Sequence, residues 1–327
     1  MISYVIRRIA YAIPILLGVN FLLFMLFFFV NTPDQMARTI LGEKRVTQEQ
    51  IDNWKREHNY HLPRFVNIRE RGIGIATQTI FWQKSMRLFR FDFGKSDTEE
   101  TYIGTELRKR IPYSLSLTIP IFIMGLIVNL FLAMIVAFYR GTYIDFWALI
   151  VCVVMMSISG MFYIIGGQAA FAVFFKLAPV SGFDTQIPYT FKFLILPIAI
   201  SVISGIGGGV RYYRTIFLEE INKDYVRTAR AKGLGEGTVL FKHVLKNAML
   251  PILTNVVVSI PFLIMGSLLL ESFFGIPGLG GYTIDAIGRQ DFAVIRAMVF
   301  LGSVLYICGL IAVDISYTLV DPRVRLR

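Results

Sequence analysis

Long apolar runs separated by short charged stretches dominate the 327-residue chain. A helix needs about 20 apolar residues to cross a bilayer. Six runs meet or approach that length, and they lack the strict alternation of polar and apolar residues typical of membrane β-strands. The six runs are Ile9–Val30, Ile111–Tyr139, Phe146–Phe175, Phe193–Val210, Asn247–Leu270 and Ala297–Val320. The pattern therefore predicts an all-α, polytopic membrane protein with six transmembrane helices.

These runs divide the chain into four parts. Residues 1–30 are expected to form an N-terminal cytoplasmic end and the first span, and residues 31–110 a long extracytoplasmic segment. Residues 111–320 form a domain of five spans, and residues 321–327 a cytoplasmic tail. Within the extracytoplasmic segment, Thr47 followed by Gln50 has the spacing of a capping box, which predicts the start of a helix.

Basic residues indicate the orientation, because Lys and Arg of short loops accumulate on the cytoplasmic side. Arg7 and Arg8 precede the first span, Arg140 follows the second, and a run of basic residues follows the fourth. With six spans, all of these lie on one side, which predicts cytoplasmic termini. Arg108 to Arg110 oppose this topology at the outer end of the second span, but long loops are translocated largely regardless of charge.

Composition supports the membrane assignment and removes other classes. The chain is 55% hydrophobic and only 17% charged, whereas soluble chains carry roughly a quarter charged residues. Its net charge of +11 comes without the basic stripe and interleaved aromatics of a nucleic-acid interface. His58 and His61 lack the further ligands of a metal site. No Walker-type glycine and lysine loop occurs, so any ATP chemistry belongs to another chain.

The loop after the fourth span, about residues 211–248, is the most informative segment. Helix-forming residues continue to Lys232 and are followed by Gly233, which stands where a helix end takes a left-handed residue. The pattern predicts a short helix, a glycine turn, and a second helix that leads into the fifth span. Ala229 and Ala231 would let another protein approach closely, and Tyr225 would anchor it. The alternative is a solvated basic loop that only fixes the topology.

Two stretches of this loop, Asp224–Leu234 and Lys242–Pro251, resemble the cytoplasmic EAA loop of ABC importer permeases. The resemblance is greatest to the B-type subunit of the oligopeptide/dipeptide family and extends almost end to end. Further similar motifs are Tyr4 with Arg7, Arg8 and Pro14, then Phe91–Ser96, Arg110–Leu117, Glu271–Gly280, Arg289–Phe292, Asp314–Tyr317 and Asp321–Arg323. Arg227 stands where the general importer loop has Glu, as is common in the peptide branch. Residues Asn67–Arg90 are longer than that branch's usual pattern.

The resemblance implies a type I ABC importer permease fold and a permease subunit that forms half of a peptide translocation path. It implies an ATPase-coupling loop that comprises Asp224, Tyr225, Arg227, Ala229, Ala231, Lys232 and Gly233. Separately, ionisable groups in or beside apolar spans are costly and often functional. Glu271 at the outer end of the fifth span, with Gly278 and Gly280, is therefore a gating or packing candidate. Asp314 in the sixth span is another, and the interface or a partner such as Arg211 could neutralise it.

The implied partners are a second homologous permease, two ABC ATPase subunits, an extracytoplasmic substrate-binding protein and the lipid bilayer of a bacterial inner membrane. Nucleic acid is not among them. The chain would then be no enzyme and would hold no cofactor or metal of its own, with ATP and Mg on the ATPases.

Two other functions stay open at this point. A nickel or other small-solute ABC importer would share the same subunit pattern. A secondary transporter or channel, from a different class, would also have six spans. It would predict inverted repeats or charged residues in the middle of a span, and neither feature is evident in the sequence.

Overall fold

The computed structural model describes residues 2–42, 46–68, 70–184 and 189–320. The described chain is built from helices, and its only β-type pairing is an isolated antiparallel bridge between Lys95 and Tyr102. The tail predicted at residues 321–327 lies outside the described residues. The all-α prediction is confirmed.

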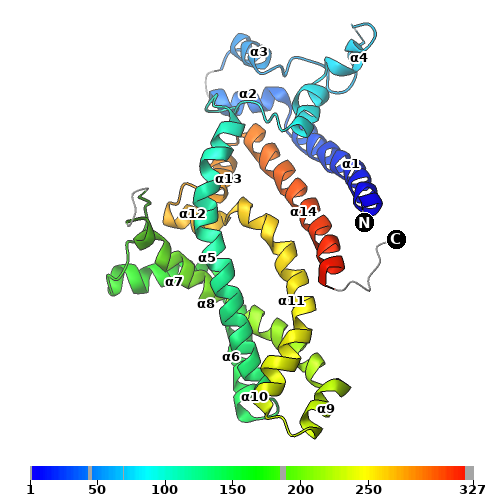
Figure 1. Cartoon of the computed structure of the whole chain (residues 1–327). Helices are drawn as coiled ribbons and strands as arrows, with labels where there is room; N and C mark the ends of the chain where they lie inside the picture. The colour runs from blue at the N-terminus through cyan, green and yellow to red at the C-terminus, as the bar shows by residue number, and fades with distance from the viewer. Residues whose placement is uncertain (1, 43–45, 69, 185–188, 321–327) are drawn as a thin grey trace. The chain divides into compact units, whose positions relative to one another are not determined.

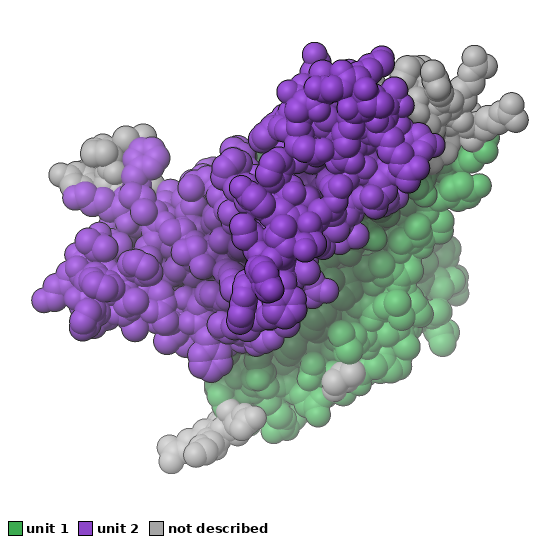
Figure 2. All heavy atoms as spheres, turned by 90° about the horizontal axis from the view of Figure 1, so that it is seen from below, with its two compact units in different colours: residues 1–111, 282–311, 326–327 green, residues 112–281, 312–325 purple. Residues whose placement is uncertain are grey.

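The chain forms two compact units, which Figure 2 shows in different colours. Unit 1 holds the chain up to Ile111 together with Tyr282–Ile311, and unit 2 holds Pro112–Gly281 together with the chain from Ala312. The long helices α5 (Ile103–Phe138) and α14 (Phe292–Val320) each contribute residues to both units.

Unit 1 packs the extramembrane helices on the end of the first span. Its elements are α1 (Ile2–Met25), a π-helical turn at Leu26–Val30, α2 (Pro33–Leu41), α3 (Gln48–Glu57), α4 (Gly74–Thr77), turns at Phe81–Ser85 and Met86–Arg90, and the start of α5. Phe24 and Phe28 stack with ring centroids 4.6 Å apart, and both are fully buried. Trp54 of α3 packs in the same core, so these aromatic side chains hold the outer helices together.

The capping box predicted at Thr47 is confirmed. The Gln50 backbone N–H donates to Thr47 Oγ1 at 3.4 Å, and the Thr47 N–H donates to Gln50 Oε1 at 3.0 Å. The same arrangement starts α2, with Thr32 and Gln35. Each pair satisfies two N–H groups that a helix start would otherwise leave without partners.

Unit 2 contains most of the helices that follow α5. They are α6 (Tyr143–Ser157), α7 (Gly160–Gly167) with a π-helical extension to Phe174, α8 (Tyr189–Ile221), α9 (Asp224–Ala231), α10 (Glu236–Thr238), a π-helical turn at Val239–Val244, α11 (Leu245–Ser259), a 3-10 turn at Ile260–Met265, α12 (Leu268–Phe274) and α13 (Leu279–Gly288), which ends in unit 1.

Glycines bring the helices of unit 2 close together. A Cβ added to Gly207 of α8 would lie 2.6 Å from the Cys152 carbonyl oxygen of α6, and one added to Gly209 would lie 2.5 Å from Asn129 Nδ2 of α5. These glycines near the middle of α8 therefore allow its neighbours α5 and α6 to pack closely against it.

Within the described residues, five helices are long and apolar enough to cross a membrane, and a bent pair makes a sixth if the pair counts as one span. The five are Ile6–Phe29, Ile103–Phe138, Phe191–Ile221, Glu236–Met265 and Phe292–Ser316. The third predicted run is instead two helices, α6 and α7, which meet at 88°. Ile158 and Ser159 have extended backbone between them, so the chain bends here where the sequence pattern predicted one continuous helix.

Two of the three basic residues that opposed the predicted topology, Lys109 and Arg110, have local partners in unit 1. Lys109 Nζ lies 3.0 Å from one Glu106 carboxylate oxygen, and Arg110 Nε lies 3.3 Å from the other. The Arg110 guanidinium also lies 4.5 Å from the centre of the Tyr282 ring. One carboxylate and one aromatic ring therefore offset part of this positive charge.

Candidate functional site

The predicted coupling helix exists as α9, Asp224–Ala231, beside α10 and the start of the following helical run (Figure 1). Val226 and Ala229 are 0% and 5% exposed, and both belong to a core formed with residues of α5, α8 and α11. A helix of eight residues cannot be stable alone in water. The buried face of α9 therefore fixes its position on the membrane helices.

A glycine turn ends α9, as the sequence predicted. Gly233 has φ +78°. Its N–H donates to the Arg230 carbonyl at 2.9 Å, and the Leu234 N–H donates to the Ala229 carbonyl at 3.4 Å. This pair of bonds is a Schellman motif, which requires a left-handed residue that only glycine adopts at little cost.

An ion pair closes the same turn from outside. Arg230 Nε and Nη2 donate to the two carboxylate oxygens of Glu236 at 2.6 and 3.1 Å. The pair joins α9 to α10 and thus to the helical run that continues as α11. A bidentate Arg–carboxylate pair restricts geometry more than a single contact does, so α9 and α10 are expected to move together. Sequence reasoning missed this pair, although the spacing of six residues is visible.

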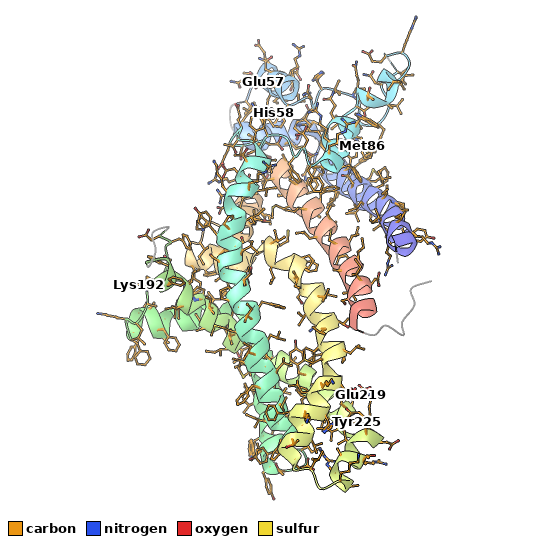
Figure 3. The ribbon with its side chains drawn as sticks, viewed as in Figure 1. Glu57, His58, Met86, Lys192, Glu219 and Tyr225 are labelled. Atoms are coloured by element: carbon orange, nitrogen blue, oxygen red, sulfur yellow. The ribbon has the colours of Figure 1, made fainter. Side chains whose placement is uncertain are left out.

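Tyr225 is a half-buried residue at the start of α9. Its hydroxyl donates to Glu220 Oε2 at 2.8 Å, and Figure 3 labels Tyr225 together with Glu219, the neighbour of Glu220 in the chain. Burial, and then the bond to Glu220, raise the pKa of Tyr225 to about 12. Tyr225 thus links the start of α9 to the end of α8. Sequence reasoning had instead expected this residue to anchor a partner protein.

The other face of α9 is exposed and carries the remaining predicted residues. Asp224, Arg227, Ala231 and Lys232 are all exposed. Arg227 Nη1 lies 3.6 Å from Asp224 Oδ1 with both side chains open to solvent, and such a pair contributes little stability. Ala229 differs from this group, because its small side chain is required by packing inside the chain. A partner can therefore contact only part of the predicted coupling loop, namely its exposed residues Asp224, Arg227, Ala231 and Lys232.

An ion pair between half-buried Arg214 and buried Asp145, which sequence reasoning missed, supports this end of unit 2. Arg214 of α8 donates from Nε and Nη2 to the two carboxylate oxygens of Asp145 of α6, both at 2.8 Å. Asp145 also accepts the Gly141 N–H at 3.0 Å. Arg211, the partner suggested for Asp314, donates to Met156 Sδ at 3.9 Å. Asp314 itself is half-buried on α14.

The second predicted group meets around Glu271, which is 0% exposed on α12. Its carboxylate accepts the Ser267 N–H at 3.2 Å and the Gly281 N–H at 3.0 Å, and it also interacts with the Ser114 hydroxyl of α5. That hydroxyl accepts the Leu279 N–H at 2.7 Å. Burial is the largest effect on this carboxyl group and raises its pKa, while the bonds to Gly281 and Ser114 oppose the rise.

Glycines leave the space that this carboxylate occupies. A Cβ on Gly278 would lie 2.5 Å from both Glu271 Cδ and Ser114 Oγ, and one on Gly280 would lie 2.5 Å from the Ser267 carbonyl carbon. Gly266 is equally close, with Ser114 Oγ at 2.7 Å. The structure therefore brings together three of the four gating or packing candidates, Glu271, Gly278 and Gly280, and adds Ser114 and Gly266. We call these five residues the glutamate cage.

Polar residues of three helices line a cavity of about 230 Å³ in unit 2. Asn129 of α5 and Asn255 of α11 take part, as does Tyr213 of α8. Within the described part of the chain, Asn129 Oδ1 is buried with no hydrogen-bond partner. Among the same residues, no group of three His, Cys, Asp or Glu side chains is placed to hold a metal ion.

Comparison with known proteins places this architecture in a family. Residues 129–326 match the model of the binding-protein-dependent transport system inner membrane component. The chain is 29% identical over 340 residues to the oligopeptide transport system permease protein AppB of Bacillus subtilis, with 99% of each chain covered. It is 30% identical over 330 residues to a putative peptide transport system permease protein of Brucella abortus, again with 99% of each covered.

The glutathione transport system permease protein GsiC of Shigella flexneri is 29% identical over 331 residues, with all of both chains covered. The match to the family model includes α9, the glycine turn and the glutamate cage except Ser114. With this match and several apolar helices of spanning length, the chain is a multi-pass membrane protein that belongs to the family of inner membrane components of binding-protein-dependent transport systems.

Proposed function

We propose that this chain is the permease subunit of an ATP-driven importer that carries peptides into a bacterium, and that it forms half of the translocation path. The observation that carries the proposal is similarity over essentially the whole chain to proteins named as oligopeptide, peptide and glutathione permeases. A second, homologous permease forms the other half of the path. The protein lies in the inner membrane with both termini cytoplasmic.

In this proposal the exposed face of α9 docks into a cleft on an ABC ATPase subunit. Arg227 and Ala231 lie on that face, and the opposite face is fixed by Val226. Movement of the ATPase is transmitted through the Gly233 turn and the Arg230–Glu236 pair to α11. Such rigid-body transmission is a known form of alternating access. Two ATPase subunits hold ATP and Mg and perform the hydrolysis, while this chain performs none and binds no cofactor.

The glutamate cage has a mechanical role in the same proposal. It attaches the turn between α12 and α13 to Ser114 of α5 through the carboxylate of Glu271. A buried polar network with its partners in place fixes one geometry. The cage therefore holds this turn rigid during transport, while an extracytoplasmic binding protein delivers the peptide.

Co-purification tests the docking of α9. A tagged chain is isolated from its native membranes, and the associated ATPase subunits are identified and quantified. Ala231→Glu places bulk and charge on the exposed face and should reduce ATPase recovery at least tenfold. Ala76→Glu is the matched control, because Ala76 is an exposed alanine of the short helix α4. Equal recovery with both variants would exclude α9 as the docking element.

Uptake by cells tests the substrate. Accumulation of a labelled tripeptide should depend on this chain and on cellular ATP. Uptake of nickel without uptake of peptide would identify a small-solute importer instead. Peptide accumulation that continues after ATP is depleted, and that stops when the proton gradient is abolished, would identify a secondary transporter.

A further inference from the structure

Residues 81–90 of unit 1 form two consecutive helical turns that pack along the side of the first span. We call these residues the double turn. The Phe81 ring centroid lies 5.1 Å from that of Phe24. One helical turn further into the span, Asn20 Nδ2 donates to the Ser85 carbonyl oxygen at 2.8 Å. The double turn is therefore held by the span itself, whereas α2 and α3 follow the end of that span.

Both contacts lie well inside the apolar length of α1. The first span comprises the 24 residues Ile6–Phe29, which at about 1.5 Å per residue are about 36 Å long. The hydrocarbon core of a bilayer is about 30 Å thick, so at most about 6 Å of the span extends beyond it. Phe24 and Asn20 lie about 8 and 14 Å from Phe29 along the helix axis. The double turn therefore meets α1 at the depth of the lipid acyl chains.

The last span places the double turn at a similar depth. Phe27 and Phe292 mark the adjoining ends of the two spans, with ring centroids 5.7 Å apart. Phe89 of the double turn packs on Phe300 of α14, with centroids 5.4 Å apart. Phe300 follows Phe292 by eight residues, which is about 12 Å along the helix. Two separate helices thus agree that the double turn reaches back into the membrane-spanning part of unit 1.

A polar cavity of about 570 Å³ lies on another side of the double turn. Its lining includes charged residues of both signs, among them Lys84, Arg87 and Asp92. Water is the favourable neighbour for such a lining, because charged groups are costly to bury without partners. Irregular backbone at membrane depth is tolerated where it is buried in protein or lines a water-filled cavity. The double turn has both surroundings, and its Ser85 carbonyl receives a hydrogen bond from the span.

The double turn also exposes apolar surface beside the lipid-facing side of α1. Trp82 is 42% exposed, and Figure 3 labels Met86, one helical turn further along the chain, next to α1. Phe21 is 43% exposed and also contacts the Phe81 ring, with centroids 6.2 Å apart. Leu22 of the same helix is 68% exposed. The exposed apolar side of the span therefore continues through Phe21 to the double turn, where Trp82 is the residue type enriched at membrane interfaces.

We propose that the double turn is a re-entrant element that lies in the leaflet around the C-terminal half of α1, and that Trp82 contacts lipid there. The chain leaves the end of α1 through α2 and α3, returns along α1 as the double turn, and leaves again before α5. Exposed Arg90 reaches the lipid phosphates, because long cationic side chains extend along apolar surface to the headgroups. The inference goes beyond the proposed function, since it assigns a lipid contact to unit 1 whatever the importer carries.

Spin labelling of the full-length chain in phosphatidylcholine proteoliposomes tests the proposal. In a Cys152→Ala, Cys308→Ala background, a nitroxide is attached to Trp82→Cys. Its collision rates are measured with oxygen, which partitions into lipid, and with a nickel chelate that stays in water. The ratio of the oxygen rate to the nickel rate should match that for Leu22→Cys, on the exposed side of α1. It should exceed the ratio for Asn53→Cys, exposed on α3, at least tenfold.

Two results of this experiment overturn the proposal. A ratio for Trp82→Cys equal to that for Asn53→Cys would place the double turn in water. Low collision rates with both reagents would show that protein, and not lipid, covers this position.

Native Trp82 provides a second measurement if the labelled variant does not fold. Emission that wild type has and Trp82→Phe lacks is assigned to Trp82. That emission should be at least halved in phosphatidylcholine brominated on its acyl chains, and iodide in the water should leave it unchanged. Trp147, which is 60% exposed on the apolar helix α6, is the reference for a residue quenched by the brominated lipid. Equal Trp82 emission in the two lipids, or quenching by iodide, overturns the proposal.

Discussion

The glutamate cage makes a sharp prediction for Gly278→Ala. Gly278 does not have a positive φ, so the effect of a methyl group there comes from space alone. Its Cβ would lie 2.5 Å from Glu271 Cδ and Ser114 Oγ, about 0.9 Å short of an ordinary 3.4 Å contact. The carboxylate must therefore move by a comparable distance, which lengthens its 3.0 Å bond to the Gly281 N–H beyond hydrogen-bond range.

The expected cost follows from these two changes. Overpacking costs about 1–3 kcal/mol, and a buried N–H left without its acceptor costs about 1–3 kcal/mol. Replacing glycine by alanine also restricts the unfolded chain, which returns about 0.4–1 kcal/mol. We expect Gly278→Ala to lower the free energy of unfolding by about 2–4 kcal/mol.

Denaturant unfolding of the full-length chain in detergent micelles measures this change. Gly288→Ala at the end of α13 is the matched control, because a Cβ there would have no atom within 4 Å. It should leave stability unchanged or raise it slightly. In a Glu271→Ala background the carboxylate that the added methyl group would overlap is absent. The loss of unfolding free energy caused by Gly278→Ala should therefore be smaller by at least about 1 kcal/mol. The same cost in both backgrounds, or no difference from Gly288→Ala, would refute the steric argument.

Three further predictions concern the ion pair, the buried carboxyl group and the glycine turn. Asp145→Asn leaves the Arg214 guanidinium buried without its counter-ion and should lower the free energy of unfolding by about 3–5 kcal/mol; a loss below about 1 kcal/mol on denaturant unfolding would show that the pair is dispensable. The pKa of Glu271 is higher in the folded chain than its ordinary value of 4.5, so its contribution to stability is complete below pH 4.5 and is lost as pH rises through the folded pKa. The stability difference between wild type and Glu271→Gln should follow that direction, and a difference that is flat or grows with pH would contradict it. Gly233→Ala forces a side chain into φ +78° and should destabilise the turn by about 1–2 kcal/mol, with faster amide hydrogen exchange in α9 than for Gly233→Asn; equal exchange in the two variants would contradict this.

Structural features that depend only on residues close together in the chain could be predicted from the sequence. Apolar runs of about 20 residues are required wherever a helix crosses a bilayer, and the described part of the chain has five such helices and a bent pair. The Thr47–Gln50 capping box and the left-handed Gly233 depend on bonds that reach at most five residues, so local sequence was enough to predict both.

Predictions failed where the outcome depended on which face of an element is buried. Ala229 and Ala231 look alike in the sequence, but α9 turns Ala229 into the core and leaves Ala231 exposed.

The third apolar run gave no sign of its 88° bend, because Ser157 to Gly160 are residues that a membrane helix also accepts.

Pairing between distant residues was decided only by the tertiary structure. Glu271 meets Ser114 across 157 residues of chain, and Asp97 meets the start of α14. Arg214 finds Asp145 from another helix.

By itself, the sequence determined the helical class, the apolar spans, the capped helix starts and the glycine turn, since hydropathy and backbone bonding act over short stretches of chain. The packing of the helices decided which carboxylates and cations are taken out of water and which partners they meet there. That choice depends on the free energy of burying a charge, and this free energy is defined only once the surrounding chain has folded.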